Sequence, residues 1–246
     1  MLKSDLIGCL YPNKCAGCDE IIPEDKELCD YCRVKINNVN YNNVCTKCGY
    51  LKEHCRCDFR EYRFKGALGV FKNEGAAGKA YYSYKLGRNE KLASFFACRV
   101  ARAIKTAFAG VSFDAVVCVP TARRSKLKRG FDHNEKIALR LSRLLNIGFL
   151  SGMLKLRHFR SLQHKSSFSK RLENVRGKYY TDKRVKLDRV LLFDDIFTTG
   201  ATLDECAKEL MFAGVKEVYA VAVLATYPDT PAISERAAFK KTNGGK

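Results

Sequence analysis

One segment in the last quarter of the chain constrains the fold more than any other feature: residues 190–203 have the sequence VLLFDDIFTTGATL. Four apolar residues, typical of a buried strand, precede Asp194 and Asp195, and a threonine- and glycine-rich turn then leads into a helical pattern. Such a turn gathers backbone N–H groups and hydroxyls at a helix N-terminus, where the helix dipole favours an anion. The paired carboxylates suit ribose hydroxyls or a magnesium ion carried by a pyrophosphate. The segment therefore predicts a strand, a phosphate-binding loop and a helix, and the alternative is a strand–turn–helix with a polar cap and no ligand.

Apolar runs and helix-period patterns alternate along most of the chain. Strands are predicted at residues 115–120, 190–193 and 218–224, and a strand or hairpin at residues 64–71. An amphipathic helix is predicted over residues 89–108, from apolar side chains at three- and four-residue spacing. Two further helices each begin with a capping pair, Asp132 with Glu135 and Thr202 with Glu205. Strands that alternate with capped helices predict an α/β domain with a parallel sheet.

Eight of the twelve cysteines lie in pairs within residues 15–57. The pairs are Cys15/Cys18, Cys29/Cys32, Cys45/Cys48 and Cys55/Cys57. A Cys-x-x-Cys turn aims two sulfurs at one ion, and two such turns complete a tetrahedral zinc site. Pairing the turns in sequence order gives two compact zinc ribbons, whereas pairing the first with the third gives one firm site. The last pair has a one-residue spacer and is the weakest, with His54 as a substitute ligand. We expect one or two structural zinc ions.

The concentration of cysteines near the N-terminus also predicts how the chain is divided into domains. Residues 1–60 are predicted to be a separate zinc-binding module, which has few apolar residues and depends on metal to fold. Residues 61–227 are predicted to form the α/β domain, and residues 228–246 a tail with a mobile end. Clustered cysteines without a secretion signal predict a reducing, cytoplasmic compartment. The apolar runs fall short of the roughly 18–20 residues that a membrane span requires, which excludes an integral membrane protein.

The positive charge is large and concentrated. The chain has 45 Lys and Arg against 26 Asp and Glu, a net charge of +19, and residues 121–189 alone carry 20 Lys and Arg against five Asp and Glu. A surplus of this kind predicts a polyanionic partner, and Phe131, Phe159 and Phe168 between the cations suit stacking with unpaired bases. A solvated basic surface with the phenylalanines in the core is the alternative. The residues predicted to bind nucleic acid are Arg123, Arg124, Lys126, Lys128, Arg129, Arg160, Lys165 and Arg171.

Residues 190–203 resemble the 5-phosphoribosyl-1-pyrophosphate (PRPP) motif of type I phosphoribosyltransferases. The resemblance implies a phosphoribosyltransferase-like parallel sheet with flanking helices, preceded here by the cysteine-rich zinc-ribbon module. It implies that Asp194 and Asp195 face the ribose, with magnesium carried by PRPP. It further implies that a loop wraps the 5-phosphate, formed by Thr198, Thr199, Gly200, Ala201 and Thr202. The polar loop after Pro120 then binds pyrophosphate through Thr121, Ala122 and Arg123.

The cysteine module and the PRPP motif together resemble the ComF family of competence proteins, from about residue 6 to residue 225. The supporting segments are Cys15-Ala16-Gly17-Cys18, Val119-Pro120, Arg129-Gly130-Phe131, and Gln163 with Arg171, Asn174 and Val175. That family acts in natural transformation, at the step that brings single-stranded DNA into the cytoplasm, and its members have no securely assigned transferase reaction. This chain departs from the family at Asp132-His133-Asn134, where Asn-Gln is usual.

The resemblance implies a protein that binds single-stranded DNA on the cytoplasmic side, free or at the inner face of the membrane beside the DNA-uptake machinery, and that retains a PRPP pocket. An active phosphoribosyltransferase with an unidentified acceptor is one alternative, favoured by the intact acid pair and threonine loop. A structural zinc adaptor that docks onto translocation machinery is another. The catalytic residues are unknown from the sequence. His133, His158 and His164 are expected to be polar surface groups, because a catalytic histidine needs a partner that sequence does not show.

Overall fold

In the computed structural model, the described residues are 12–36, 39, 41–58, 60–87, 89–157 and 175–227. A five-stranded sheet in the order β1-β7-β6-β2-β3 forms the centre of the molecule, and all its strand pairs are parallel. The strands are β1 (Gly66–Lys72), β2 (Ala115–Cys118), β3 (Gly148–Phe149), β6 (Leu187–Phe197) and β7 (Val215–Ala225). A separate antiparallel pair joins β4 (Lys155–Leu156) to β5 (Tyr179–Tyr180). The predicted parallel α/β fold is confirmed.

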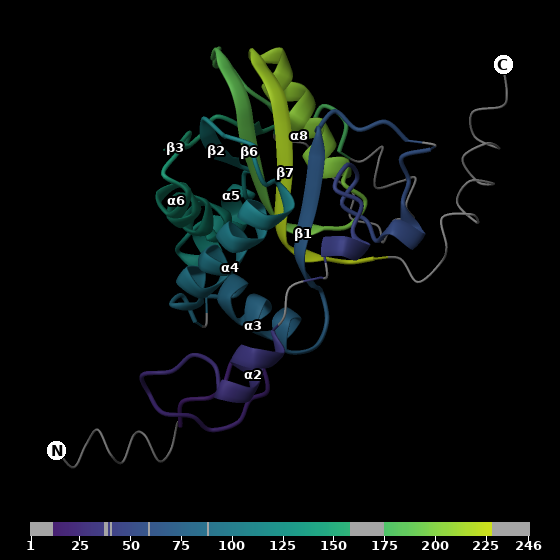
Figure 1. Cartoon of the computed structure of the whole chain (residues 1–246). Helices are drawn as coiled ribbons and strands as arrows, with labels where there is room; N and C mark the ends of the chain where they lie inside the picture. The colour runs from purple at the N-terminus through teal and green to yellow at the C-terminus, as the bar shows by residue number, and fades with distance from the viewer. Residues whose placement is uncertain are drawn as a thin grey trace, which may run out of the picture.

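Helices cover both faces of the sheet (Figure 1). They are α3 (Gly75–Lys85), α4 (Leu92–Ala107), α5 (Arg123–Arg129), α6 (His133–Leu145) and α8 (Ala201–Phe212). Side chains alternate along β6, because successive residues of a strand point to opposite faces. Leu191 and Phe193 join the core beneath α3, α4 and α6, whereas Val190 and Leu192 join the core beneath α8. Burial on both faces explains why this strand has a continuous apolar sequence rather than an alternating one.

The cysteine-rich segment forms two small units, which we call the first ribbon (residues 15–35) and the second ribbon (residues 45–57). The first ends with α2 (Asp30–Lys35), the second contains the 3-10 turn η2 (Lys52–His54), and the 3-10 turn η1 (Tyr41–Asn43) lies between them. The first ribbon lies below α3, and the second lies beside β1 at the edge of the sheet (Figure 1). Cys15, Leu28 and Cys32 join the core that includes α3 and α4. The ribbons therefore pack onto the α/β domain instead of standing apart from it.

Strand β1 is an edge strand of the sheet, and the cysteine-rich segment covers its outer edge. The N–H group of Ala67 donates to the carbonyl oxygen of Thr46 at 2.9 Å, and the N–H group of Val39 donates to that of Val70 at 2.8 Å. These bonds pair backbone groups that an edge strand would otherwise leave open to other chains. A division of the chain at residues 60 and 227 remains a prediction, because these contacts cross the first of those boundaries.

Two local expectations were wrong. The polar loop expected after Pro120 contains a helix, α5, from Arg123 onward, which ends at Gly130 with a φ of 78°. Helix α8 begins at Ala201 with Gly200 as its N-cap, so Thr202 and Glu205 do not form the expected capping box. The Glu205 carboxylate instead accepts a hydrogen bond from the Gly177 N–H at 2.9 Å. The Asp132 cap is confirmed, because its side chain accepts from the N–H groups of Asn134 and Glu135.

Candidate functional site

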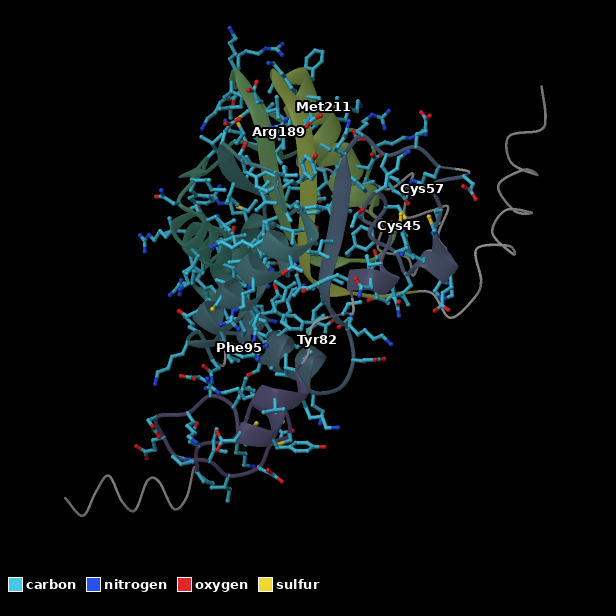
Figure 2. The ribbon with its side chains drawn as sticks, in the orientation of Figure 1. Cys45, Cys57, Tyr82, Phe95, Arg189 and Met211 are labelled. Atoms are coloured by element: carbon cyan, nitrogen blue, oxygen red, sulfur yellow. The ribbon has the colours of Figure 1, made fainter. Side chains whose placement is uncertain are left out.

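The eight paired cysteines form two separate four-sulfur clusters. One contains Cys15, Cys18, Cys29 and Cys32, and the other Cys45, Cys48, Cys55 and Cys57; within each, the ligand atoms lie within 4.8 Å of one another. The pairs therefore combine in sequence order, and the interleaved pairing was wrong. Figure 2 labels Cys45 and Cys57 of the second ribbon, at the edge of the sheet. The fourth ligand of this cluster is Cys57, so His54 is not needed as a substitute.

The sulfur geometry fits zinc. The sulfurs of Cys18 and Cys29 lie 3.7 Å apart, and so do those of Cys45 and Cys57. Four sulfurs placed tetrahedrally at about 2.3 Å from zinc are separated from one another by about 3.8 Å. All four ligand positions are thiolates, which is typical of a structural site and leaves no open position for substrate. The clusters are consistent with two structural zinc ions.

Asp194 and Asp195 lie near the carboxyl end of β6, beside a pocket of about 290 Å³. In an open parallel sheet this end is where ligands bind. The pocket receives side chains from α3, α5, α6 and α8 as well as from β6. Its polar lining includes Lys85, Thr121, Arg129, His133, Asp194, Asp195 and Thr202. The strand therefore brings the predicted acid pair together with residues from four helices and from the loop after β2.

Asp195 is held in its ionised form by residues of α3 and α6. The Lys85 ammonium forms an ion pair with Oδ2 of Asp195, and Nε2 of His133 lies 3.2 Å from the same oxygen. Burial alone would raise the pKa of Asp195, but the His133 hydrogen bond and the Lys85 charge hold it well below its usual range. Nη2 of Arg129 donates to Nδ1 of His133 at 3.1 Å. Since arginine has no acceptor, the His133 ring proton must be on Nε2, directed at Asp195.

The pKa of Asp194 is shifted in the opposite direction from that of Asp195. Its carboxyl group is buried, and Oδ1 accepts hydrogen bonds from the Asp195 N–H at 2.8 Å and from Nδ2 of Asn134 at 3.2 Å. Burial, followed by repulsion from the Asp195 charge, raises the pKa of Asp194 well above its usual value. Two neighbouring carboxyl groups with pKa values pushed apart can play different roles. The pair thus offers two adjoining carboxyl groups whose pKa values are shifted in opposite directions.

The predicted phosphate loop (residues 198–202) follows β6 directly. Gly200 has a φ of 70°, a left-handed conformation that favours glycine, and its N-cap position directs the first turn of α8. Thr199 is buried, and its Oγ1 accepts from the Ala201 N–H at 3.3 Å, so its hydroxyl stabilises the loop itself. Of the five predicted loop residues, Thr202 lines the pocket. The prediction that the whole loop wraps a phosphate is not tested by this geometry.

The segment after β2 also contributes to the lining of the pocket. Thr121 lines the pocket, and its hydroxyl donates to Oδ1 of Asp132 at 3.0 Å. Lys126 forms ion pairs with Asp132 at 3.0 Å and with Glu135 at 3.5 Å. Ala122, Arg123, Arg124 and Lys128 are exposed, and Arg129 is half-buried against His133. Ser125 and Arg129 are the α5 residues that line the pocket, whereas the exposed cations of this helix are not part of the lining and Lys126 is paired with acids.

Several predicted nucleic-acid residues lie outside the described residues: Arg160, Lys165 and Arg171, together with Phe159, Phe168, His158 and His164. So do Gln163, Asn174 and the tail at residues 228–246. Phe131 is buried and packs against Tyr84, which favours the core alternative for this ring. The expectation that His133 is a surface group was wrong, because it is buried between Arg129 and Asp195. Lys85, which forms an ion pair with Asp195, was not predicted from the sequence to be a site residue.

The part of the chain that the structure describes has no helix long and apolar enough to cross a membrane.

Comparisons with known proteins cover both parts of the chain. Residues 6–59 match the family described as a double zinc ribbon domain. Competence protein F of Haemophilus influenzae is 30% identical over 108 residues, which are 43% of this chain and 47% of that protein. DNA utilization protein YhgH of Escherichia coli strain K12 is 24% identical over 209 residues, which are 83% of this chain and 86% of that protein. The chain thus spans about half the length of the first relative and most of the second.

The solved structures that resemble this chain are less similar to it in sequence than the two relatives above. An adenine phosphoribosyltransferase is 14% identical, with 58% of this chain and 82% of that chain covered and a TM-score of 0.34. A purine phosphoribosyltransferase from Pyrococcus horikoshii is 16% identical, with 57% and 90% covered and a TM-score of 0.33.

The sheet topology, the acid pair at the end of β6 and the two sulfur clusters define the class of protein. It is an α/β domain with a parallel sheet, preceded by a cysteine-rich segment that matches a double zinc ribbon. The relatives add a second similarity. Over the shares given above, the chain is similar to Competence protein F and to the DNA utilization protein YhgH.

Proposed function

We propose that this protein acts in natural transformation by binding single-stranded DNA on the cytoplasmic side, while retaining a pocket for PRPP or a related phosphorylated ligand. The observation that carries the proposal is the position of α5 at the rim of the pocket. Arg123, Arg124 and Lys128 are exposed there, while Ser125 and Arg129 of the same helix line the pocket. A polyanion that follows α5 would therefore pass the opening of the pocket.

The names of two relatives support the same role. One is a competence protein and the other a DNA utilization protein, and both roles require handling of DNA. The charge supports it too, because residues 121–189 carry 20 Lys and Arg against five Asp and Glu. One small ligand cannot use so many cations, whereas the phosphates of a nucleic acid can. Membrane-associated DNA-uptake machinery is the partner that would deliver such a strand, at the inner face of the membrane.

In the pocket, we assign the ribose to the acid pair and the 5-phosphate to residues 198–202. Asp195, kept charged by Lys85 and His133, would accept a hydrogen bond from a ribose hydroxyl. The segment at Thr121, Ala122 and Arg123 would hold a pyrophosphate. A magnesium ion carried by PRPP would neutralise part of that charge.

The test is a binding isotherm with a labelled single-stranded oligonucleotide at several salt concentrations, repeated with PRPP and magnesium present. We expect binding that weakens as salt rises, because electrostatic contacts release counterions. A protein that binds no oligonucleotide at low salt, with its zinc content intact, would contradict the DNA-binding proposal.

An active phosphoribosyltransferase is the second candidate, and the charged Asp195 beside His133 favours it. In that reaction an acceptor nitrogen forms a bond to C1 of the ribose while the C1–O bond to pyrophosphate breaks. Pyrophosphate leaves with the electron pair, and the acceptor nitrogen loses a proton. Release of pyrophosphate with one of a panel of nucleobases would establish this candidate, and its absence with every base would remove its support.

A further inference from the structure

The second ribbon makes direct hydrogen bonds to the phosphate loop. Tyr50, between the cluster residues Cys48 and Cys55, is fully buried and donates from its hydroxyl to the carbonyl oxygen of Thr198 at 2.6 Å. Three residues after the ribbon, Nη1 of Arg60 donates to the carbonyl oxygen of Thr199 at 3.0 Å. Two successive carbonyl groups of the loop are therefore held by side chains from the cysteine-rich segment.

Packing at this contact is close. The Tyr50 ring meets Phe197, the residue before the loop, edge to face with centroids 5.3 Å apart. Gly49 has a φ of 76°, and a Cβ atom there would lie 3.0 Å from Cβ of Ala67 and 3.3 Å from Phe197. A glycine thus lets the ribbon approach the strand that leads into the loop. A Cβ atom at Gly200, inside the loop, would lie 3.3 Å from the Tyr62 ring.

The conformation that presents Tyr50 depends on the sulfur cluster. The Cys45 N–H donates to the Tyr50 carbonyl at 2.7 Å, which closes the turn that bears Cys48. On the other side, the buried Arg56 guanidinium lies 4.4 Å from the Tyr50 ring centroid, between Cys55 and Cys57. Tyr50 is therefore held on both sides by segments that the four sulfurs join. A small segment of this kind takes its folding free energy from the metal.

The first ribbon contacts a different part of the molecule. A Cβ atom at Gly17 would lie 3.3 Å from Cβ of Ala76 in α3, and Nη2 of Arg99 in α4 donates to the Arg33 carbonyl at 3.2 Å. The first ribbon thus packs on the helices, and the second packs on the loop. This difference makes one ribbon a control for the other.

We propose that zinc binding by the second ribbon sets the conformation of the phosphate loop, with Tyr50 and Arg60 as positioning residues. Zinc occupancy of the second cluster and affinity of the loop for its ligand are then linked. The linkage is reciprocal, so a ligand that favours the ordered loop also favours retention of that zinc ion by the same factor. The identity of the ligand as PRPP or phosphate rests on the proposed function, whereas the coupling of ribbon to loop does not.

The first test uses the zinc-loaded full chain without ligand. Amide hydrogen exchange is compared between the wild type, Tyr50→Phe and the matched control Tyr31→Phe, which changes an exposed tyrosine on α2. Loss of one buried hydrogen bond should speed exchange over residues 198–204 by about threefold to tenfold in Tyr50→Phe. The control should exchange like the wild type. Unchanged exchange of the loop in Tyr50→Phe would overturn the proposal.

The second test follows zinc release to a chromogenic chelator, with and without PRPP and, separately, inorganic phosphate. We expect a bound probe to slow release of one of the two ions and to leave the other unchanged. The slowed ion should be absent from Cys57→Ser and present in Cys18→Ser. Equal protection of both ions, or of neither, by a probe that calorimetry shows to bind would overturn the proposal. If neither probe binds the wild type, the proposed pocket fails, and the exchange comparison still decides the coupling.

Discussion

Nε2 of His133 lies 3.2 Å from Oδ2 of Asp195, a contact that joins the first turn of α6 to the carboxyl end of β6. The Lys85 ammonium reaches the same carboxylate from the last turn of α3. Three elements that are far apart in the sequence therefore fix one charge in the pocket. The neighbouring Asp194 carries the opposite perturbation, and this contrast can be measured.

Asp194→Asn should stabilise the protein at neutral and alkaline pH. Burial and the Asp195 charge raise the pKa of Asp194 in the folded state, so the unfolded chain releases this proton first. The stability contributed by this group is full below about pH 4 and falls as pH rises towards the folded pKa. Asparagine keeps an oxygen for the Asp195 N–H and does not titrate. We expect a midpoint of thermal unfolding higher by at least about 3 °C at pH 8 and unchanged at pH 4.

Asp195→Asn is the matched comparison, and its sign is reversed. The pKa of Asp195 is depressed, so its contribution to stability is present above about pH 4 and is lost as pH falls through the folded pKa. This variant should unfold at a lower temperature than the wild type at pH 7, with the difference shrinking in acid. Equal shifts for the two variants across this pH range would contradict the assigned charges.

Most of the sheet could be predicted from the sequence because its strands are buried on both faces. The expected strands at 64–71, 115–120, 190–193 and 218–224 correspond to β1, β2, β6 and β7. Strand β3 has two residues and forms at the edge beside β2, so it is too short to show a strand pattern of its own. Helix α5 has no buried residue, and its basic sequence therefore lacked the apolar face from which a helix is recognised.

The site was predictable where its residues adjoin in sequence, and not where they meet through the fold. The acid pair and the loop form one continuous segment, and each cysteine cluster lies within 18 residues or fewer. Lys85 and His133 lie 110 and 62 residues from Asp195, so only the packing of α3 and α6 reveals them. One local signal existed for His133, because the Asp132 cap places the next residue in the first turn of α6. That the His133 ring points towards Asp195 could be seen only in the structure.

Purified protein should contain two zinc ions per chain, as measured by elemental analysis. The warrant is the pair of four-sulfur clusters, each with sulfurs spaced as tetrahedral zinc requires. Cys15→Ser and Cys45→Ser should each lose about one ion and leave the other in place, because the clusters share no ligand. Cys206→Ser, at a buried position outside both clusters, should keep both ions. Loss of both ions in either ligand variant would contradict two independent sites.

Removing pocket residues should weaken binding of PRPP with magnesium. Asp195→Asn removes a charged acceptor and Thr202→Val removes a hydroxyl, both at the lining of the pocket. A hydrogen bond to a charged group is worth about 1.5–3 kcal/mol, so Asp195→Asn should cost about tenfold or more in affinity. Thr202→Val should cost less, because a neutral hydrogen bond is weaker. Calorimetry is the measurement, and Thr106→Val on the exposed face of α4 is the control. If Asp195→Asn binds PRPP with the same affinity as the wild type, PRPP does not bind at this carboxylate.

Reversing the exposed charges of α5 should weaken binding of single-stranded DNA and flatten its salt dependence. Arg123, Arg124 and Lys128 are exposed, whereas Lys126 is paired with Asp132 and Glu135 and is left unchanged. If four to six cations meet phosphates, the slope of log affinity against log salt should be about −3 to −4 in the wild type. Replacing the three cations with glutamate should bring the slope about 2 units closer to zero.

The control for this charge reversal changes three exposed cations on and beside α4: Lys91, Arg102 and Lys105. Both triple variants alter the net charge of the protein by the same amount, so a nonspecific effect of charge would weaken them equally. A surface built around α5 would instead make the first variant much weaker and leave the second near the wild type at low salt. The α5 variant should weaken binding by a similar factor for oligonucleotides of different sequence, because phosphate contacts carry no base information. Equal loss in both variants would mean that DNA does not follow α5, and the pocket would then have no nucleic acid at its rim.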